Sequence, residues 1–101
     1  MFPKPKRRVN RDLLRRFTRM RCVVENENCF GPVAGHHIKA RGSGGEDVEE
    51  NLIPLCAGHH TVRPDSYHQL GHVDFYERWK DRFPGWALDR VEAYLISRRL
   101  L

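Results

Sequence analysis

Apolar residues in the first half of the chain recur first at helical and then at strand-like spacing. The three- and four-residue repeat within 12–22, set between arginines, predicts a short amphipathic helix with a basic outer face. Residues 22–32 carry Asn, Gly and Pro in place of this repeat and predict a turn. The apolar stretches 33–40 and 51–56 predict two strands, and the glycines of 41–47 predict a flexible hairpin loop between them. The residues of the helical repeat are Leu13, Leu14, Phe17 and Met20.

The second half of the chain has helical spacing that is broken twice by proline. A helix is expected to open at the histidine pair 59–60 and to break near Pro64, because proline cannot occupy a helix interior. Two further helices are expected within about 73–99, separated by Pro84, with their aromatic residues in the core. Helices around one two-stranded hairpin predict an α+β fold. One expected helical face carries Phe75, Trp79 and Phe83, and the other carries Ala87, Val91, Tyr94 and Leu95.

The positive charge of the chain is concentrated at its N-terminus. The 101 residues predict a single domain at 10–101, preceded by a basic flexible arm at 1–9. Residues 1–21 hold nine Lys and Arg against Asp12 alone, a charge of +8, whereas the whole chain carries +5. Such an arm favours a nucleic-acid partner, the alternative being a solvated basic face. The residues expected to contact DNA from this part of the chain are Lys4, Lys6, Arg7, Arg8, Arg11 and Arg15.

Cysteine usage points to metal binding in a reducing compartment. No apolar run is long enough for a signal peptide or a membrane span, so a cytoplasmic protein is expected. Three cysteines cannot all pair within one chain, and a reducing compartment disfavours disulfides. Cys22, Cys29 and Cys56 are therefore interpreted as metal ligands together with His59, the alternative being buried, inert thiols. The pair Cys56 and His59 has a spacing typical of zinc, so a closed, structural Cys3His zinc knuckle is expected.

The histidines of the chain are clustered. All six lie between His36 and His72, and two adjacent pairs, at 36–37 and 59–60, flank Asn51. Neutral imidazole both binds divalent metals and accepts protons near neutral pH. Paired histidines around an asparagine therefore predict metal-assisted proton abstraction rather than packing, and their clustering indicates one local site.

The order strand, loop, strand, helix, with these residues at its key positions, resembles the ββα-metal active site (His-Me finger) of the HNH endonucleases. Asn51 follows His37 by fourteen positions and His60 follows Asn51 by nine, both typical of that family. The strings HHIKARGSGG at 36–45 and ENLIPLC at 50–56 further resemble compact phage and prophage HNH nucleases, including recombination-promoting ones. The resemblance covers about a third of the chain. It implies a ββα-metal motif at about 33–70 and metal-dependent hydrolysis of DNA in a bacterial host cell.

The resemblance also implies roles for individual residues. His37 is expected to be the general base that activates water, and His36 a ligand of the catalytic cation. Because adjacent strand residues point to opposite faces, the two side chains can serve these different partners. Asn51 is expected to hold the loop and to orient His37 through its amide. His60 is expected to be a second metal ligand.

The third metal ligand departs from the family pattern. A second histidine is often found four positions after the helix ligand, where this chain has Pro64. The string HQLG at 68–71 resembles a displaced family segment, so His68 is expected to be the third ligand, in preference to His72. The cation would stabilise the departing 3′ oxygen, with Lys39 and Arg41 adding positive charge near the DNA. Histidine ligands are softer than those that magnesium prefers, so Mn, Co, Ni or Zn are candidates beside Mg.

Two non-catalytic alternatives remain at the level of sequence. A zinc-containing DNA-binding module would use the same basic arm and the cysteines, but it leaves His37 and Asn51 unexplained. A phage packaging or recombination accessory would use a nuclease fold as a docking platform for other proteins. The retention of every catalytic-type position in this chain argues against that second alternative.

Overall fold

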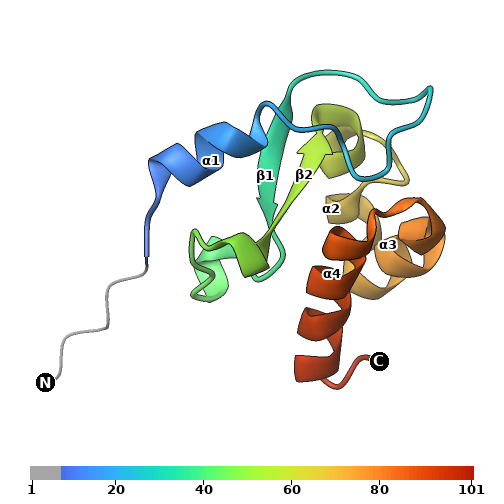
Figure 1. The fold of residues 1–101 in the computed structure, drawn as a ribbon. Coiled ribbons are helices and arrows are strands. Elements are labelled where there is room, and N and C mark those ends of the chain that lie inside the picture. Colours follow the sequence, from blue (N-terminus) through green and yellow to red (C-terminus); the bar gives the residue numbers. More distant parts are fainter. Residues whose placement is uncertain (1–7) are drawn as a thin grey trace, which may run out of the picture.

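The computed structural model describes residues 8–101. A two-stranded antiparallel hairpin stands between one helix on one side and three helices on the other (Figure 1). This arrangement confirms the expected α+β class. The helices and strands are α1 (Arg11–Phe17), β1 (Val33–His37), β2 (Leu52–Cys56), α2 (Tyr67–Leu70), α3 (His72–Trp79) and α4 (Gly85–Ser97).

The core is divided between the two faces of the hairpin. Leu13 and Phe17 of α1 pack against Leu52, whereas Ile53 and Leu55 belong to a larger cluster with α3 and α4. Neighbouring residues of a strand point to opposite faces, so β2 supplies both clusters and is buried along its whole length. The hairpin is therefore held firmly from both sides, which gives the functional side chains of β1 a rigid support.

The first helix is shorter than the sequence predicts. Asn10 caps its start, with Oδ1 accepting the backbone N–H of Leu13 at 3.0 Å. Beyond α1 the N–H of Thr18 donates to a carbonyl three positions earlier, so the last turn tightens and the helix ends before Cys22. Met20 is 40% exposed, because it follows the end of the helix and lies outside the buried face.

The connection between the strands, where the glycines predict a flexible hairpin loop, is compact and contains hydrogen-bonded turns. Strand β1 ends at His37, before the predicted end at residue 40, and a 3₁₀ turn follows at Arg41–Ser43. A Cβ atom at Gly45 would lie 1.7 Å from the carbonyl oxygen of Lys39, so the chain passes itself at a distance that only glycine allows. Asp47, near the end of this connection, is buried.

The C-terminal helices form most of the larger cluster. Phe75 and Phe83 are both buried, but Phe83 follows a 3₁₀ turn at Lys80–Arg82 and has extended backbone. Their spacing predicts that the two aromatics share one helical face, and this prediction is wrong because Phe83 lies beyond the end of the helix. Ala87, Val91 and Leu95 form the buried face of α4, as expected. No described helix has both the length and the apolar character that a membrane span requires.

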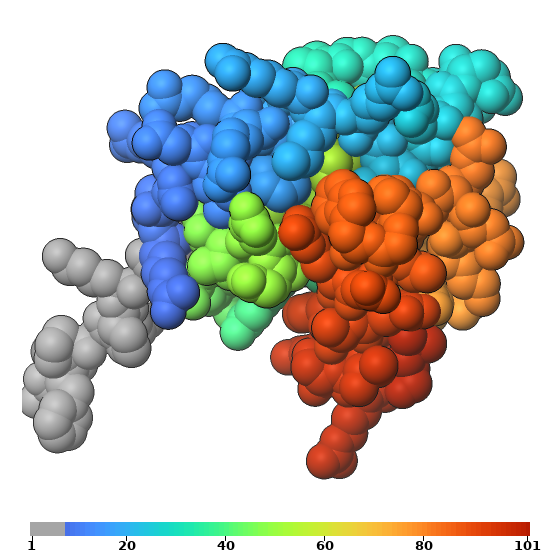
Figure 2. All heavy atoms as spheres, viewed as in Figure 1, coloured from blue at the N-terminus to red at the C-terminus, as the bar shows by residue number. Residues whose placement is uncertain are grey.

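Residues 1–7 of the expected arm, with Lys4, Lys6 and Arg7, lie outside the described residues. Arg8 is attached to the connection between the strands. Its N–H donates to Oε2 of Glu46 at 3.0 Å, and its carbonyl accepts the N–H of Asp47 at 2.9 Å. Figure 2 shows the consequence: the blue N-terminal segment and α1 lie against the green segment that leads into β2.

Candidate active site and metal centre

Three histidines from three separate segments converge beside β1. His36 lies on β1, His60 in a wide helical turn at Gly58–Val62, and His68 in α2. Each offers one ring nitrogen, and these nitrogens lie within 4.8 Å of one another. The ring centroids of His60 and His68 are 4.9 Å apart, and that of His36 is 5.0 Å from His60. These three residues, referred to below as the histidine trio, are spaced so that one metal ion could contact all of them.

An irregular turn brings His60 and His68 together. The N–H of Arg63 donates to the carbonyl of Gly58, five residues earlier, at 2.9 Å, which closes a turn wider than an α-helical one. Arg63 then takes an extended backbone before Pro64, as residues before proline usually do, so the expected break is confirmed. The chain restarts as α2, which places His68 near His60 despite the proline between them.

Burial favours the neutral, metal-binding form of two members of the trio, His36 and His60, whereas His68 is exposed. Burial lowers the pKa of His36 well below the usual range, and the nearby His60 and His68 add to this shift. Burial also lowers the pKa of His60. Nε2 of His36 is buried without a hydrogen-bond partner among residues 8–101, which is costly for a polar atom unless a ligand engages it. Neutral imidazole is the ligand form of histidine, so the chemistry of the trio fits a bound cation.

A cavity of about 410 Å³ opens onto both the histidine trio and His37. His37 follows His36 on β1 and pairs with Leu52, so it lies on the α1 side of the hairpin. It lines this cavity and also a second one along α1. His72 lines the first cavity too, but its Nδ1 lies 2.5 Å from the hydroxyl of Tyr67 and it is outside the trio.

The partner of His37 is Asp47, a residue that the sequence pattern did not mark. Nε2 of His37 lies 2.7 Å from Oδ1 of Asp47, whose side chain is fully buried. Burial alone would raise the pKa of this carboxyl, but hydrogen bonds from His37 and the Asn10 backbone, with the charge of Arg41, lower the pKa overall. Asp47 therefore stays ionised against the imidazole. Its only sequence signal was its place between His37 and Asn51.

Asn51 holds the connection between the strands. Its Oδ1 accepts the N–H of Lys39 at 2.7 Å, and its Nδ2 donates to the carbonyls of Lys39 and Glu46 at 3.1 and 3.0 Å. These bonds fasten both ends of the compact turn, as expected. The further expectation, that the amide orients His37, is corrected: among the described residues Asp47 contacts that ring and the Asn51 amide does not.

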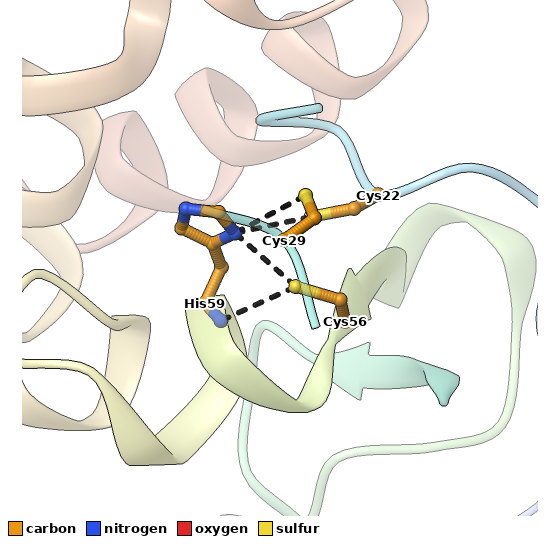
Figure 3. A group of neighbouring side chains, drawn as sticks. All are labelled: Cys22, Cys29, Cys56 and His59. Carbon is orange, nitrogen blue, oxygen red and sulfur yellow. Dashed lines mark hydrogen bonds between the residues drawn. The ribbon is translucent and has the colours of Figure 1, made fainter. Parts of the chain in front are cut away.

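A second candidate metal-binding group consists of three cysteines and His59. The sulfur atoms of Cys22, Cys29 and Cys56 surround Nδ1 of His59 at 3.8, 3.4 and 3.2 Å (Figure 3). One ring nitrogen has a single proton or a single lone pair, so it cannot bond to three sulfurs at once. Zinc bonds of about 2.3 Å to sulfur and about 2.0 Å to nitrogen in a tetrahedron place S and N roughly 3.5 Å apart. The observed distances fit that value, and the group can hold a metal ion such as Zn²⁺.

The protonation of this group also fits a metal. Burial raises the pKa of the Cys22 thiol, and it raises the pKa of Cys29 to about 12. Burial lowers the pKa of His59, which leaves its imidazole neutral. Without a cation, the buried Cys22 and the less buried Cys29 remain neutral thiols. A divalent ion would convert them to thiolates, so binding is expected to release protons.

The Cys3His group joins the turn after α1 to the end of β2 and the wide turn that follows it. Cys22 and Cys29 come from the turn after α1, Cys56 ends β2, and His59 lies in the wide turn. His59 and His60 are adjacent in the chain. A metal held by the Cys3His group would therefore fix the backbone that carries His60, a member of the histidine trio. The two groups are thus chemically separate but mechanically linked.

Two of the basic residues expected to contact DNA, Arg15 and Arg41, lie beside the site. Arg41 lies beside His37, with Nε 3.4 Å from Nε2 of that ring. Arg15 and Arg41 line the second cavity, along α1, which also reaches His37. Arg15 is paired with Asp12 at 2.8 Å in this state. Of the other expected contacts, Arg8, Arg11 and Lys39 are exposed at the surface, whereas Lys4, Lys6 and Arg7 lie outside the described residues.

No protein-family model matches the chain, and neither a curated protein nor a solved structure is significantly similar to it. The function is therefore inferred from the site itself.

Proposed function

We propose that this protein is a metal-dependent endodeoxyribonuclease of the HNH type. The proposal rests chiefly on one observation: His37 opens onto the same cavity as the histidine trio while its ring is held by a different partner. A base and a metal-binding group beside one cavity are the two requirements of assisted phosphodiester hydrolysis. The sequence resemblance to HNH endonucleases supports the same reading.

The residues of the site suit an in-line attack on a phosphodiester. His37 would take a proton from the water molecule that attacks the scissile phosphate, while Asp47 holds the imidazole ring of His37 in position. Arg41, beside His37, would contribute positive charge close to the phosphate. His36, His60 and His68 would hold the cation, which when bound stabilises charge on the phosphate and on the departing 3′ oxygen. The products would carry a 5′ phosphate.

The Cys3His group is proposed to have a structural role. It is closed, with three buried ligands and one partly exposed, and it has no position left for a substrate. Zinc is the metal that suits such a ligand set. Because His59 lies in the same wide turn as His60, the Cys3His group would hold His60 in position near His36.

The proposal is tested by incubating the full chain with supercoiled plasmid in turn with Mg, Mn, Co, Ni and Zn salts. Cleavage that depends on the added metal, is stopped by a chelator and leaves 5′ phosphate ends is the expected result. Plasmid that stays intact under every metal, while the protein binds DNA and retains zinc, would instead favour a non-catalytic zinc-containing DNA-binding or phage packaging and recombination accessory.

A shortened chain tests the role of the basic arm. Removal of residues 1–7 deletes Lys4, Lys6 and Arg7 but keeps Arg8, which contacts Glu46 and Asp47. DNA affinity should fall, and its dependence on log salt should become shallower by roughly 0.9 per lost phosphate contact on duplex DNA. Turnover at saturating DNA should stay nearly the same. An unchanged affinity and salt slope would remove the arm from the DNA-binding surface.

A further inference from the structure

Asp47 is bonded both to His37 and to the N-terminal segment. Its side chain is fully buried, and each carboxylate oxygen accepts a separate donor. Oδ1 lies 2.7 Å from Nε2 of His37, and Oδ2 accepts the backbone N–H of Asn10 at 2.9 Å. Its own N–H donates to the carbonyl of Arg8 at 2.9 Å. Asp47 is thus held between the N-terminal segment and the ring of His37.

The contacts of Nε2 of His37 determine which ring nitrogen carries the proton. Nε2 lies 2.7 Å from the Asp47 carboxylate and 3.4 Å from Nε of Arg41. A nitrogen of neutral imidazole is either a donor or an acceptor, and Arg41 can only donate. The short contact to an ionised acceptor is the stronger one, so Nε2 carries the proton and donates it to Asp47. Nδ1 is then the basic nitrogen, and no described residue hydrogen-bonds to it.

We propose that Asp47 is the positioning residue for His37: its carboxylate holds the Nε2–H tautomer and leaves Nδ1 unprotonated to accept a proton from water. The role of Nδ1 as a base rests on the proposed nuclease function, whereas the assignment of the Nε2–H tautomer does not. Arg41, 3.6 Å from the same carboxylate, contributes to the charge balance of this pair. The N-terminal segment completes the arrangement, because the N–H of Asn10 donates to the carboxylate and the carbonyl of Arg8 accepts the backbone N–H of Asp47.

Replacement of Asp47 by asparagine separates this role from simple packing. An asparagine has nearly the same shape but offers only one acceptor oxygen on its side chain. If that oxygen meets His37, the amide NH₂ faces the N–H of Asn10, donor against donor. If the amide turns over, its NH₂ faces Nε2, and the imidazole must move its proton to Nδ1. The substitution should therefore shift the tautomer of His37 and remove the base in that fraction of molecules.

The matched control is Glu46→Gln. Glu46 lies next to Asp47 on the same connection and also accepts from the N-terminal segment, at the N–H of Arg8, but it does not contact His37. Any effect of loosening this connection should appear in both variants. An effect on the imidazole should appear in Asp47→Asn alone.

The first measurement is NMR of the zinc-loaded full chain with ¹⁵N-labelled histidine, at an alkaline pH where the imidazoles are neutral. The ring signals of His37 are identified by their loss in His37→Gln. We expect the proton on Nε2 in the wild type and in Glu46→Gln, and a shift toward Nδ1–H in Asp47→Asn. A wild-type His37 with its proton on Nδ1, or an unchanged tautomer in Asp47→Asn, would overturn the proposal.

The second measurement is cleavage. Asp47→Asn should lower kcat about tenfold or more, as expected when a residue that orients a catalytic histidine is lost, with DNA affinity and zinc content unchanged. Glu46→Gln should stay within a few-fold of the wild type. Equal activity of Asp47→Asn and wild type would overturn the positioning role. A wild type that cleaves no DNA would overturn the nuclease function, and the tautomer measurement would still decide the role of Asp47.

Discussion

Replacement of His37 by alanine should lower the turnover of DNA cleavage by about a hundredfold or more, because the variant lacks the base that takes a proton from water. DNA affinity and bound zinc should be unaffected, since His37 belongs to neither candidate metal group. The measurement is the single-turnover rate of plasmid cleavage at saturating protein, with zinc determined on the same sample.

The His37→Ala substitution also leaves the buried Asp47 carboxylate without the hydrogen bond from the imidazole, which by itself lowers the free energy of unfolding. His37→Gln avoids this problem, because a glutamine amide can still donate to the carboxylate but is not a base. Both variants should be inactive, and His37→Gln should melt closer to the wild type. His72→Gln, at another histidine of the same cavity, is the control and should stay active. Cleavage within a few-fold of wild type in His37→Gln would assign the base to another residue.

Replacement of Cys56 by serine should release zinc and strongly destabilise the protein. Cys56 has the shortest sulfur distance to Nδ1 of His59, 3.2 Å, and also accepts the backbone N–H of His59. The Cys3His group joins three segments, namely the turn after α1, β2 and the wide turn, so loss of its metal should loosen all of them. For a domain of this size each kcal/mol lost lowers Tm by about 4–8 °C, and a fall of more than about 10 °C is expected. Metal analysis and thermal unfolding measure the two effects.

The control for this substitution is His60→Ala, which alters the histidine trio and leaves the Cys3His group complete. It should abolish metal-dependent cleavage, retain one zinc per chain and melt close to the wild type. A wild-type protein that contains no zinc, with a Cys56→Ser variant of unaltered stability, would show that the three thiols are ordinary core residues.

The local patterns of the sequence were sufficient for most of the elements. The helical repeat, the two apolar stretches and Pro64 predicted α1, the strands and the break before α2, since each reflects a short-range preference of the backbone. Boundaries were less accurate. The helix ended before Met20, the connection between the strands was compact, and Phe83 left its helical face. The helix end and Phe83 follow tightened turns, whereas the compact connection depends on a close approach of the chain to itself at Gly45.

The sequence by itself determined which residues are chemically able to act: the clustered histidines, the three cysteines and the basic N-terminus follow from residue type and spacing. The two groups that the sequence predicts, His36 with His60 and His68, and His59 with the three cysteines, are also the ones that the structure brings together. Only the tertiary structure supplied the close approach of the segments that carry them. It also gave His37 its partner, because the Asp47 carboxylate reaches that ring only once the connection folds back and the N-terminal segment closes over it. Ligand sets and buried ion pairs depend on distances between residues far apart in the chain, and folding alone fixes those distances.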